Sequence, residues 1–169
     1  MKKRLSGIFV LLVLVVAACN SRQEEPVAVH KDYMHDAVGM VKSGAYHITN
    51  LEVIKTDWKA KLLKASKGAK LVDFRIEKGV TTGDKSEDYY ILIARSADKK
   101  LKAASLLELK GDNFYLQVNN TSAHGSYGNI VCVGDCIHGC DPTVSSYDGT
   151  KYLNCSPCAD CVKNESEMH

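Results

Sequence analysis

Cysteine is the residue type whose number and spacing say most about the chemistry of this chain. Six of the seven cysteines lie in the last quarter of the 169 residues, in two clusters spaced C-x3-C-x3-C and C-x2-C-x2-C. Cysteines of exported proteins pair as disulfides, and six of them allow 15 pairings. The even number therefore predicts a disulfide framework built from Cys132, Cys136, Cys140, Cys155, Cys158 and Cys161.

The segment between the two clusters predicts how they approach each other. Asp148-Gly149, flanked by alternating residues, is a strong signal for a two-residue β-hairpin turn. In the register of that hairpin, Cys136 faces Cys161 and Cys140 lies one step from Cys158. Prolines interrupt both arms near the cysteines, so the spacing by itself selects no connectivity.

Metal binding and thiol redox chemistry are the alternatives for the same cysteines. Zinc takes four thiolate or imidazole ligands, and both clusters have short ligand-like spacings. The run from Cys155 to Cys158 also resembles the C-x-P-C motif of thioredoxin-type proteins. Only 11 residues follow that motif, too few for the helix and strands that activate such a pair. We expect disulfides and no cofactor; a metal site, if present, would use Cys136, Cys140, Cys155, Cys158 and His138.

The amino-terminal segment predicts export. It reads MKKRLSGIFVLLVLVVAAC, with three basic residues, an apolar run too short to span a bilayer, and small residues before Cys19. This layout resembles the lipobox signal of bacterial lipoproteins, loosely of the Bacteroidota type. The resemblance implies cleavage before Cys19, lipid attachment (diacylglycerol and palmitate-type chains) to that residue, and membrane anchoring outside the cytoplasm. Asn20, in place of an Asp, favours the outer membrane.

The charge of the mature chain argues against nucleic-acid binding. The signal carries three of the 22 basic residues and none of the 20 acidic ones, so the mature chain holds 19 basic and 20 acidic residues. Such a chain has no net positive field to attract phosphates.

Hydrophobic periodicity predicts the elements that position the cysteines. Apolar residues at helical spacing indicate helices over 32–43 and over 56–67, the second with Thr56 as N-cap and Trp58 in its apolar stripe. Alternation predicts strands over 71–77, a central strand over 89–94, and a hairpin around Gly111. We therefore expect an α+β fold, with helices packed on an antiparallel sheet.

The domain division follows from shifts in composition. We expect a signal peptide over 1–18, a polar tether over 19–29, an α+β domain over 30–119, a linker over 120–129, and a cysteine-rich hairpin module over 130–169.

No catalytic motif for hydrolysis, phosphate binding or dinucleotide binding occurs in the sequence. We therefore predict a non-catalytic binding or envelope-structural lipoprotein. Its expected partners are the membrane, through the lipid on Cys19, and an envelope protein or glycan. The alternatives are a zinc-binding or thiol-redox lipoprotein and an inhibitor or immunity-type interaction protein.

Overall fold

The secondary structure is dominated by strands. The computed structural model describes residues 33–61, 69–119, 126–136 and 140–168. Within them, nine strands form one sheet, three form a second, and α1 is the single helix. The elements are β1 (Gly39–Lys42), β2 (Ala45–Ile48), α1 (Leu51–Lys61), β3 (Leu71–Val80), β4 (Thr82–Gly83), β5 (Asp88–Ser96), β6 (Leu101–Lys110), β7 (Asn113–Leu116), β8 (Val118–Asn119), β9 (Ser126–Val133), β10 (Pro142–Tyr147), β11 (Thr150–Cys155) and β12 (Val162–Met168). The predicted α+β class, with helices packed on a sheet, is therefore wrong.

Strand β6 lies at the centre of the large sheet. It pairs antiparallel with β5 along one edge and with β9 and β7 along the other. β3 extends the sheet beyond β5, β12 extends it beyond β9, and the β1–β2 hairpin extends it beyond β7. The prediction of a central strand over 89–94 is confirmed by β5, which has strands on both sides.

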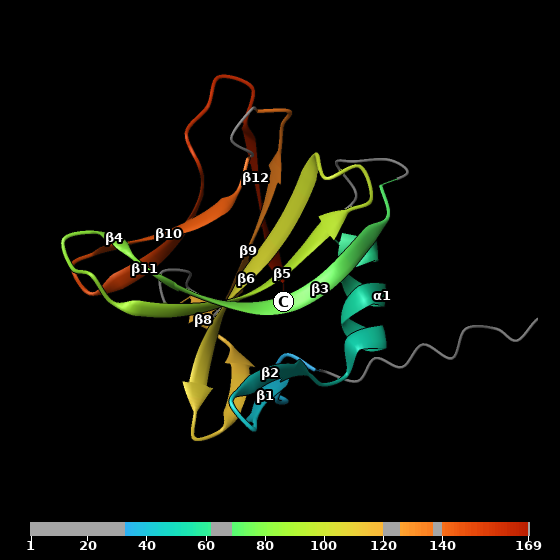
Figure 1. Ribbon diagram of the computed structural model, residues 1–169, viewed down its shortest axis with the longest axis vertical. Coiled ribbons are helices and arrows are strands. Elements are labelled where there is room, and N and C mark those ends of the chain that lie inside the picture. Colours follow the sequence, from blue (N-terminus) through green and yellow to red (C-terminus); the bar gives the residue numbers. More distant parts are fainter. Residues whose placement is uncertain (1–32, 62–68, 120–125, 137–139, 169) are drawn as a thin grey trace, which may run out of the picture.

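Both faces of the large sheet are covered at its central strands, which explains why β5 is apolar on both sides. On one face, Ile54 and Trp58 of α1 are fully buried in a core that includes Leu92. On the other face, Val144 of the small sheet packs in a second core with Ile93. Figure 1 shows α1 and the small sheet on opposite sides of the large sheet.

The first predicted helix, 32–43, is replaced by a turn and a strand. Ser43 and Gly44 have φ angles of 53° and 76°, and two consecutive positive values are characteristic of a tight hairpin turn. That turn joins β1 to β2, and the amide of Val41 donates to the carbonyl of Asp112 at 2.8 Å. Pairing along both edges of β1 thus overrides a local spacing that also fits a helix.

Helix α1 begins five residues before the predicted start at Thr56. The carbonyl of Asn50 accepts hydrogen bonds from the amides of Val53 and Ile54, at 3.0 and 3.2 Å. Thr56 is therefore not the N-cap but lies inside the helix, where its hydroxyl donates to the carbonyl of Glu52. The predicted end of the helix, at 67, lies outside the described residues.

The cysteine-containing segment is built into the large sheet. β9 begins inside the predicted linker 120–129 and pairs with β6, and β12 returns antiparallel along the other edge of β9. Only the hairpin β10–β11 leaves this sheet, and it adds β4 as a parallel third strand. The residues after 130 thus contribute both to the large sheet and to the β10–β11 hairpin (Figure 1).

Candidate functional site

An open groove of about 960 Å³ separates the β10–β11 hairpin from the large sheet. The lining comes from β6, β8, β9 and β12 on one side and from both hairpin strands on the other. Leu106, Ile130 and Leu153 give the groove an apolar base, and the first two are 9% and 1% exposed. Side chains able to stack or to form hydrogen bonds complete the lining, among them Tyr147, Tyr152, Asn154, Lys163 and Glu165. An apolar surface with a few polar groups is typical of ligand sites.

The hairpin presents two aromatic rings on one face. Its turn residues Asp148 and Gly149 have φ angles of 49° and 75°, and Tyr147 pairs with Thr150, so the predicted hairpin is confirmed. Tyr147 and Tyr152 remain 50% and 43% exposed, and their ring centroids lie 6.4 Å apart. Rigid, half-exposed rings provide contact area at a low entropic cost.

A polar network crosses from the hairpin to β12. Asn154 donates from Nδ2 to the hydroxyl of Ser145 at 2.9 Å, and its Oδ1 accepts from Lys163 Nζ at 3.4 Å. Lys163 also forms an ion pair with Glu165. The two charged side chains are 38% and 68% exposed, so their mutual attraction adds little stability. They therefore stay accessible as a donor and an acceptor for a ligand.

Three further contacts hold the hairpin in place. Lys102 of β6, whose side chain is only 10% exposed, forms an ion pair with Asp141. Lys151 donates to the carbonyl of Asp88 at 2.7 Å, and the amide of Asp148 donates to the carboxylate of Asp84 at 3.3 Å. The wall of the groove is thus fixed to β6, β5 and the segment after β4.

Electrostatic contacts also shift pKa values around the cysteine segment. Lys100 donates to Asp135 at 2.5 Å, and this hydrogen bond raises the pKa of the lysine. Burial, with a smaller contribution from the charge of Glu77, raises the pKa of Tyr89, which packs against the second core.

All six clustered cysteines are paired, which confirms the predicted disulfides. The bonds join Cys132 to Cys155, Cys136 to Cys158, and Cys140 to Cys161, with Cα–Cα distances of 5.7, 6.5 and 5.4 Å. These distances fall in the usual range for disulfides.

The three bonds indicate an oxidising, extracytoplasmic environment. No helix among the described residues is long and apolar enough to cross a membrane.

The connectivity departs from the extrapolated hairpin register. The register holds as far as Asp141 and Ser156, whose backbones are hydrogen bonded at 2.7 Å. Beyond them the cysteines pair in parallel order, first with first and third with third, so Cys136 does not face Cys161. The reason is β12, which starts at Val162 opposite Val133 and carries the preceding residues back to the end of β9.

No family model, no curated protein and no solved structure matches this chain.

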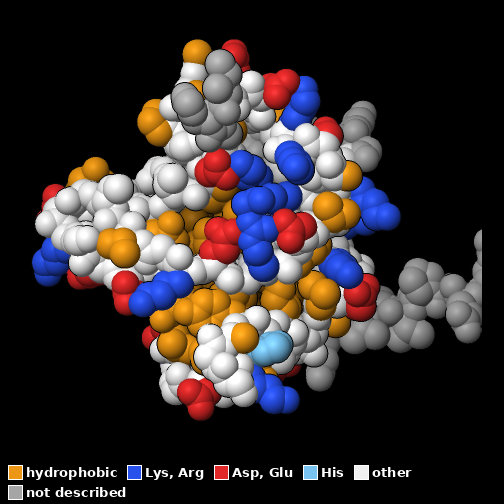
Figure 2. Space-filling model, in the orientation of Figure 1, with side chains coloured by type: hydrophobic (Ala, Val, Ile, Leu, Met, Phe, Trp, Pro, Cys, Tyr) orange, Lys and Arg blue, Asp and Glu red, His pale blue; other side chains and the backbone are white. Residues whose placement is uncertain are grey.

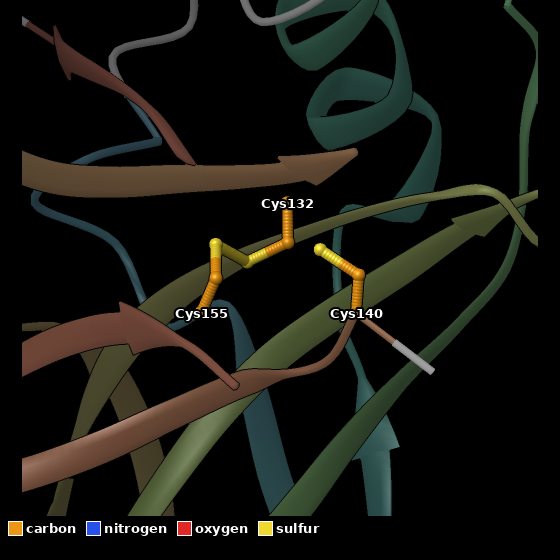
Figure 3. Close-up of side chains that lie close together, drawn as sticks. All are labelled: Cys132, Cys140 and Cys155. Atoms are coloured by element: carbon orange, nitrogen blue, oxygen red, sulfur yellow. A yellow bond between two sulfur atoms is a disulfide. The ribbon is translucent and has the colours of Figure 1, made fainter. Parts of the chain in front are cut away.

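The residues of the alternative zinc set do not lie together as free ligands. All four cysteines of the set are in disulfides: Cys136 is bonded to Cys158, Cys140 to Cys161 and Cys155 to Cys132. His138 lies outside the described residues. Three described sulfurs, those of Cys132, Cys140 and Cys155, all lie within 4.8 Å of one another (Figure 3). The two cysteines of the C-x-P-C run are not bonded to each other.

Sequence reasoning did not single out the residues of the groove. The lipidation residue Cys19 lies outside the described residues. Tyr147 and Tyr152 flank the predicted Asp148-Gly149 turn. Two aromatic residues beside a hairpin turn could therefore have indicated a binding surface from the sequence. Lys163 and Glu165 had no signal, because their relation to the hairpin depends on the return of β12 along β9.

Proposed function

We propose that this protein is a lipid-anchored extracytoplasmic binding protein that holds a glycan chain of the cell envelope in the groove beside the β10–β11 hairpin. The observation that carries the proposal is the pair of half-exposed rings, Tyr147 and Tyr152, next to the hydrogen-bonding side chain of Asn154. Sugar rings combine apolar C–H faces with hydroxyl edges, so they match an aromatic surface bordered by amide and charged groups.

The shape and charge of the groove support a glycan over other ligands. The groove is open, which suits a chain that continues past the site. Its charged lining residues are of both signs, Lys151 and Lys163 against Glu165, which gives no strong field for a polyanion. Exposed charges at Lys163 and Glu165 on the edge strand β12 also disfavour the addition of a peptide strand there.

The proposed anchor is the lipid on Cys19, followed by the tether 19–29. Its support is the lipobox-like signal together with the three disulfides, because an export signal and disulfide bonds each indicate a location outside the cytoplasm. Two or more acyl chains on one cysteine hold a protein firmly on a membrane. The polar tether would leave the groove accessible above the membrane surface, with the outer membrane favoured by Asn20.

Calorimetric titration with soluble hexasaccharides tests the groove. Mature protein is titrated with chitohexaose, maltohexaose and cellohexaose, and we expect saturable binding of at least one. Tyr152→Ala should weaken that binding about tenfold, because it removes one of the two stacking surfaces.

The matched control is Tyr115→Ala on β7, outside the lining of the groove. It should leave the affinity unchanged, with circular dichroism confirming that both variants fold. Absence of binding to all three sugars, or equal loss in the two variants, would overturn the proposal.

A further inference from the structure

Two of the three disulfides lie close enough to exchange partners. The sulfur of Cys140 and the two sulfurs of the Cys132–Cys155 bond all lie within 4.8 Å of one another. Figure 3 shows the sulfur of Cys140 pointing toward that bond. Neither Cys136 nor Cys158 belongs to this group among the described residues. The third bond, Cys136–Cys158, is therefore chemically separate from the other two.

Burial divides the four cysteines of these two bonds into an inner and an outer pair. Cys132 and Cys140 are 0% and 3% exposed, whereas Cys155 and Cys161 are partly exposed. Each bond thus joins one buried cysteine to one that is partly exposed. An external thiol meets the Cys140–Cys161 bond at Cys161, and attack there expels Cys140 as the leaving group.

We propose that the Cys140–Cys161 and Cys132–Cys155 bonds form an internal thiol–disulfide exchange site, which an external dithiol opens at Cys161. This inference goes beyond the proposed glycan binding and does not depend on it. The dithiol is oxidised to its own disulfide, and Cys140 and Cys161 are reduced to thiols. The thiolate of Cys140 then attacks the sulfur of Cys132, a Cys132–Cys140 bond forms, and the sulfur of Cys155 leaves as a thiolate and takes up a proton.

Solvation favours this direction of exchange. A thiolate is stabilised where water can reach it, so the partly exposed Cys155 is a better leaving group than the buried Cys132. The product keeps a disulfide between the two buried sulfurs and places both free thiols, Cys155 and Cys161, at the surface. Reduction of one bond consequently removes two of the three covalent links, Cys132–Cys155 and Cys140–Cys161, that hold the segment after β11. The Cys136–Cys158 bond is the link that remains.

The variant Cys161→Ser tests the exchange without any reductant, because it leaves Cys140 without its partner. The full chain is exported and purified, trapped at low pH, labelled with a maleimide in denaturant and mapped as non-reduced peptides. We expect the label on Cys155 and a peptide pair linked through Cys132 and Cys140. The matched control, Cys158→Ser, should carry its label on Cys136 and about tenfold less label on Cys155.

Wild-type protein treated with a limiting amount of dithiothreitol gives a second test should Cys161→Ser fail to fold. Labels on Cys155 and Cys161, with a Cys132–Cys140 linkage, support the exchange. Labels on Cys140 and Cys161, with the Cys132–Cys155 linkage intact, would overturn it, as would a label confined to Cys140 in Cys161→Ser.

Discussion

At the scale of single residues, burial decides which polar groups shape the stability of this protein. The hydroxyl of Tyr33, which is 3% exposed, donates to Asp57 of α1 at 2.8 Å. Burial, and then the hydrogen bond and the charge of Asp57, raise the pKa of Tyr33 far above its ordinary value. This contact ties the segment before β1 to the helix that covers the first core.

Tyr33 should make the stability of the protein depend on alkaline pH. The folded state keeps the phenol protonated while the unfolded chain ionises near pH 10, so the stabilisation is complete below pH 10 and is lost as the pH rises further. At pH 11 the loss from this group should be about 1 kcal/mol. Urea denaturation at pH 8 and pH 11 measures it, with Tyr33→Phe as the comparison. A variant whose stability falls as steeply as that of the wild type would contradict this assignment.

At the scale of elements, the small sheet depends on one close backbone approach. Gly83 has a φ of 102°, and a Cβ at this position would lie 2.3 Å from the carbonyl oxygen of Ser146. Parallel pairing of β4 with β10 runs through this contact, and the amide of Asp84 donates to the same oxygen at 2.9 Å. Only glycine meets both the steric and the conformational requirement.

Gly83→Ala should therefore separate β4 from β10 and cost about 3 kcal/mol in the free energy of unfolding, the sum of backbone strain and the clash. Gly111→Ala is the matched control, because Gly111 also has a positive φ, of 60°, but no neighbour within 4 Å of its added Cβ. It should cost only about 1 kcal/mol. Urea denaturation of both variants gives the comparison, and equal costs would show that the close approach does not matter.

At the scale of the whole molecule, the cysteine-containing segment acts as a covalent frame. The Cys132–Cys155 bond joins β9 of the large sheet to β11 of the small sheet, and the Cys140–Cys161 bond joins the segment before β10 to the segment before β12. The bonded cysteines are 21 to 23 residues apart in the sequence. A disulfide that closes a loop of that length contributes about 3 kcal/mol to stability in the chain-entropy model. Over β3 and β5, basic and acidic side chains interleave on the face shown in Figure 2.

Membrane attachment of the whole chain should depend on Cys19. Cys19→Ser removes the thiol to which the lipid would be joined, so the protein should move from the membrane fraction to the soluble fraction, with loss of labelling by radioactive palmitate. Cys161→Ser, which leaves the proposed anchor intact, should remain with the membrane. Retention of Cys19→Ser in membranes would show that the lipid is not the anchor.

The sequence by itself determined the features that depend on local chemistry. The Asp148-Gly149 hairpin, the Gly111 turn between β6 and β7, the central strand β5 and the disulfide state of the six clustered cysteines all follow from turn residues, apolar runs and an even cysteine count. In the first three cases residues within a few positions of one another carry the signal, whereas the disulfide state follows from the number of cysteines between 132 and 161.

Tertiary structure alone decided the rest. Whether 39–42 forms a strand or a helix depends on β7, which lies about 70 residues away. The order of disulfide pairing and the groove both depend on the return of β12 along β9, because that return brings Cys161 to Cys140 and Lys163 to Asn154. Such contacts join distant residues, and no local pattern in the chain specifies which distant partner a strand edge will meet.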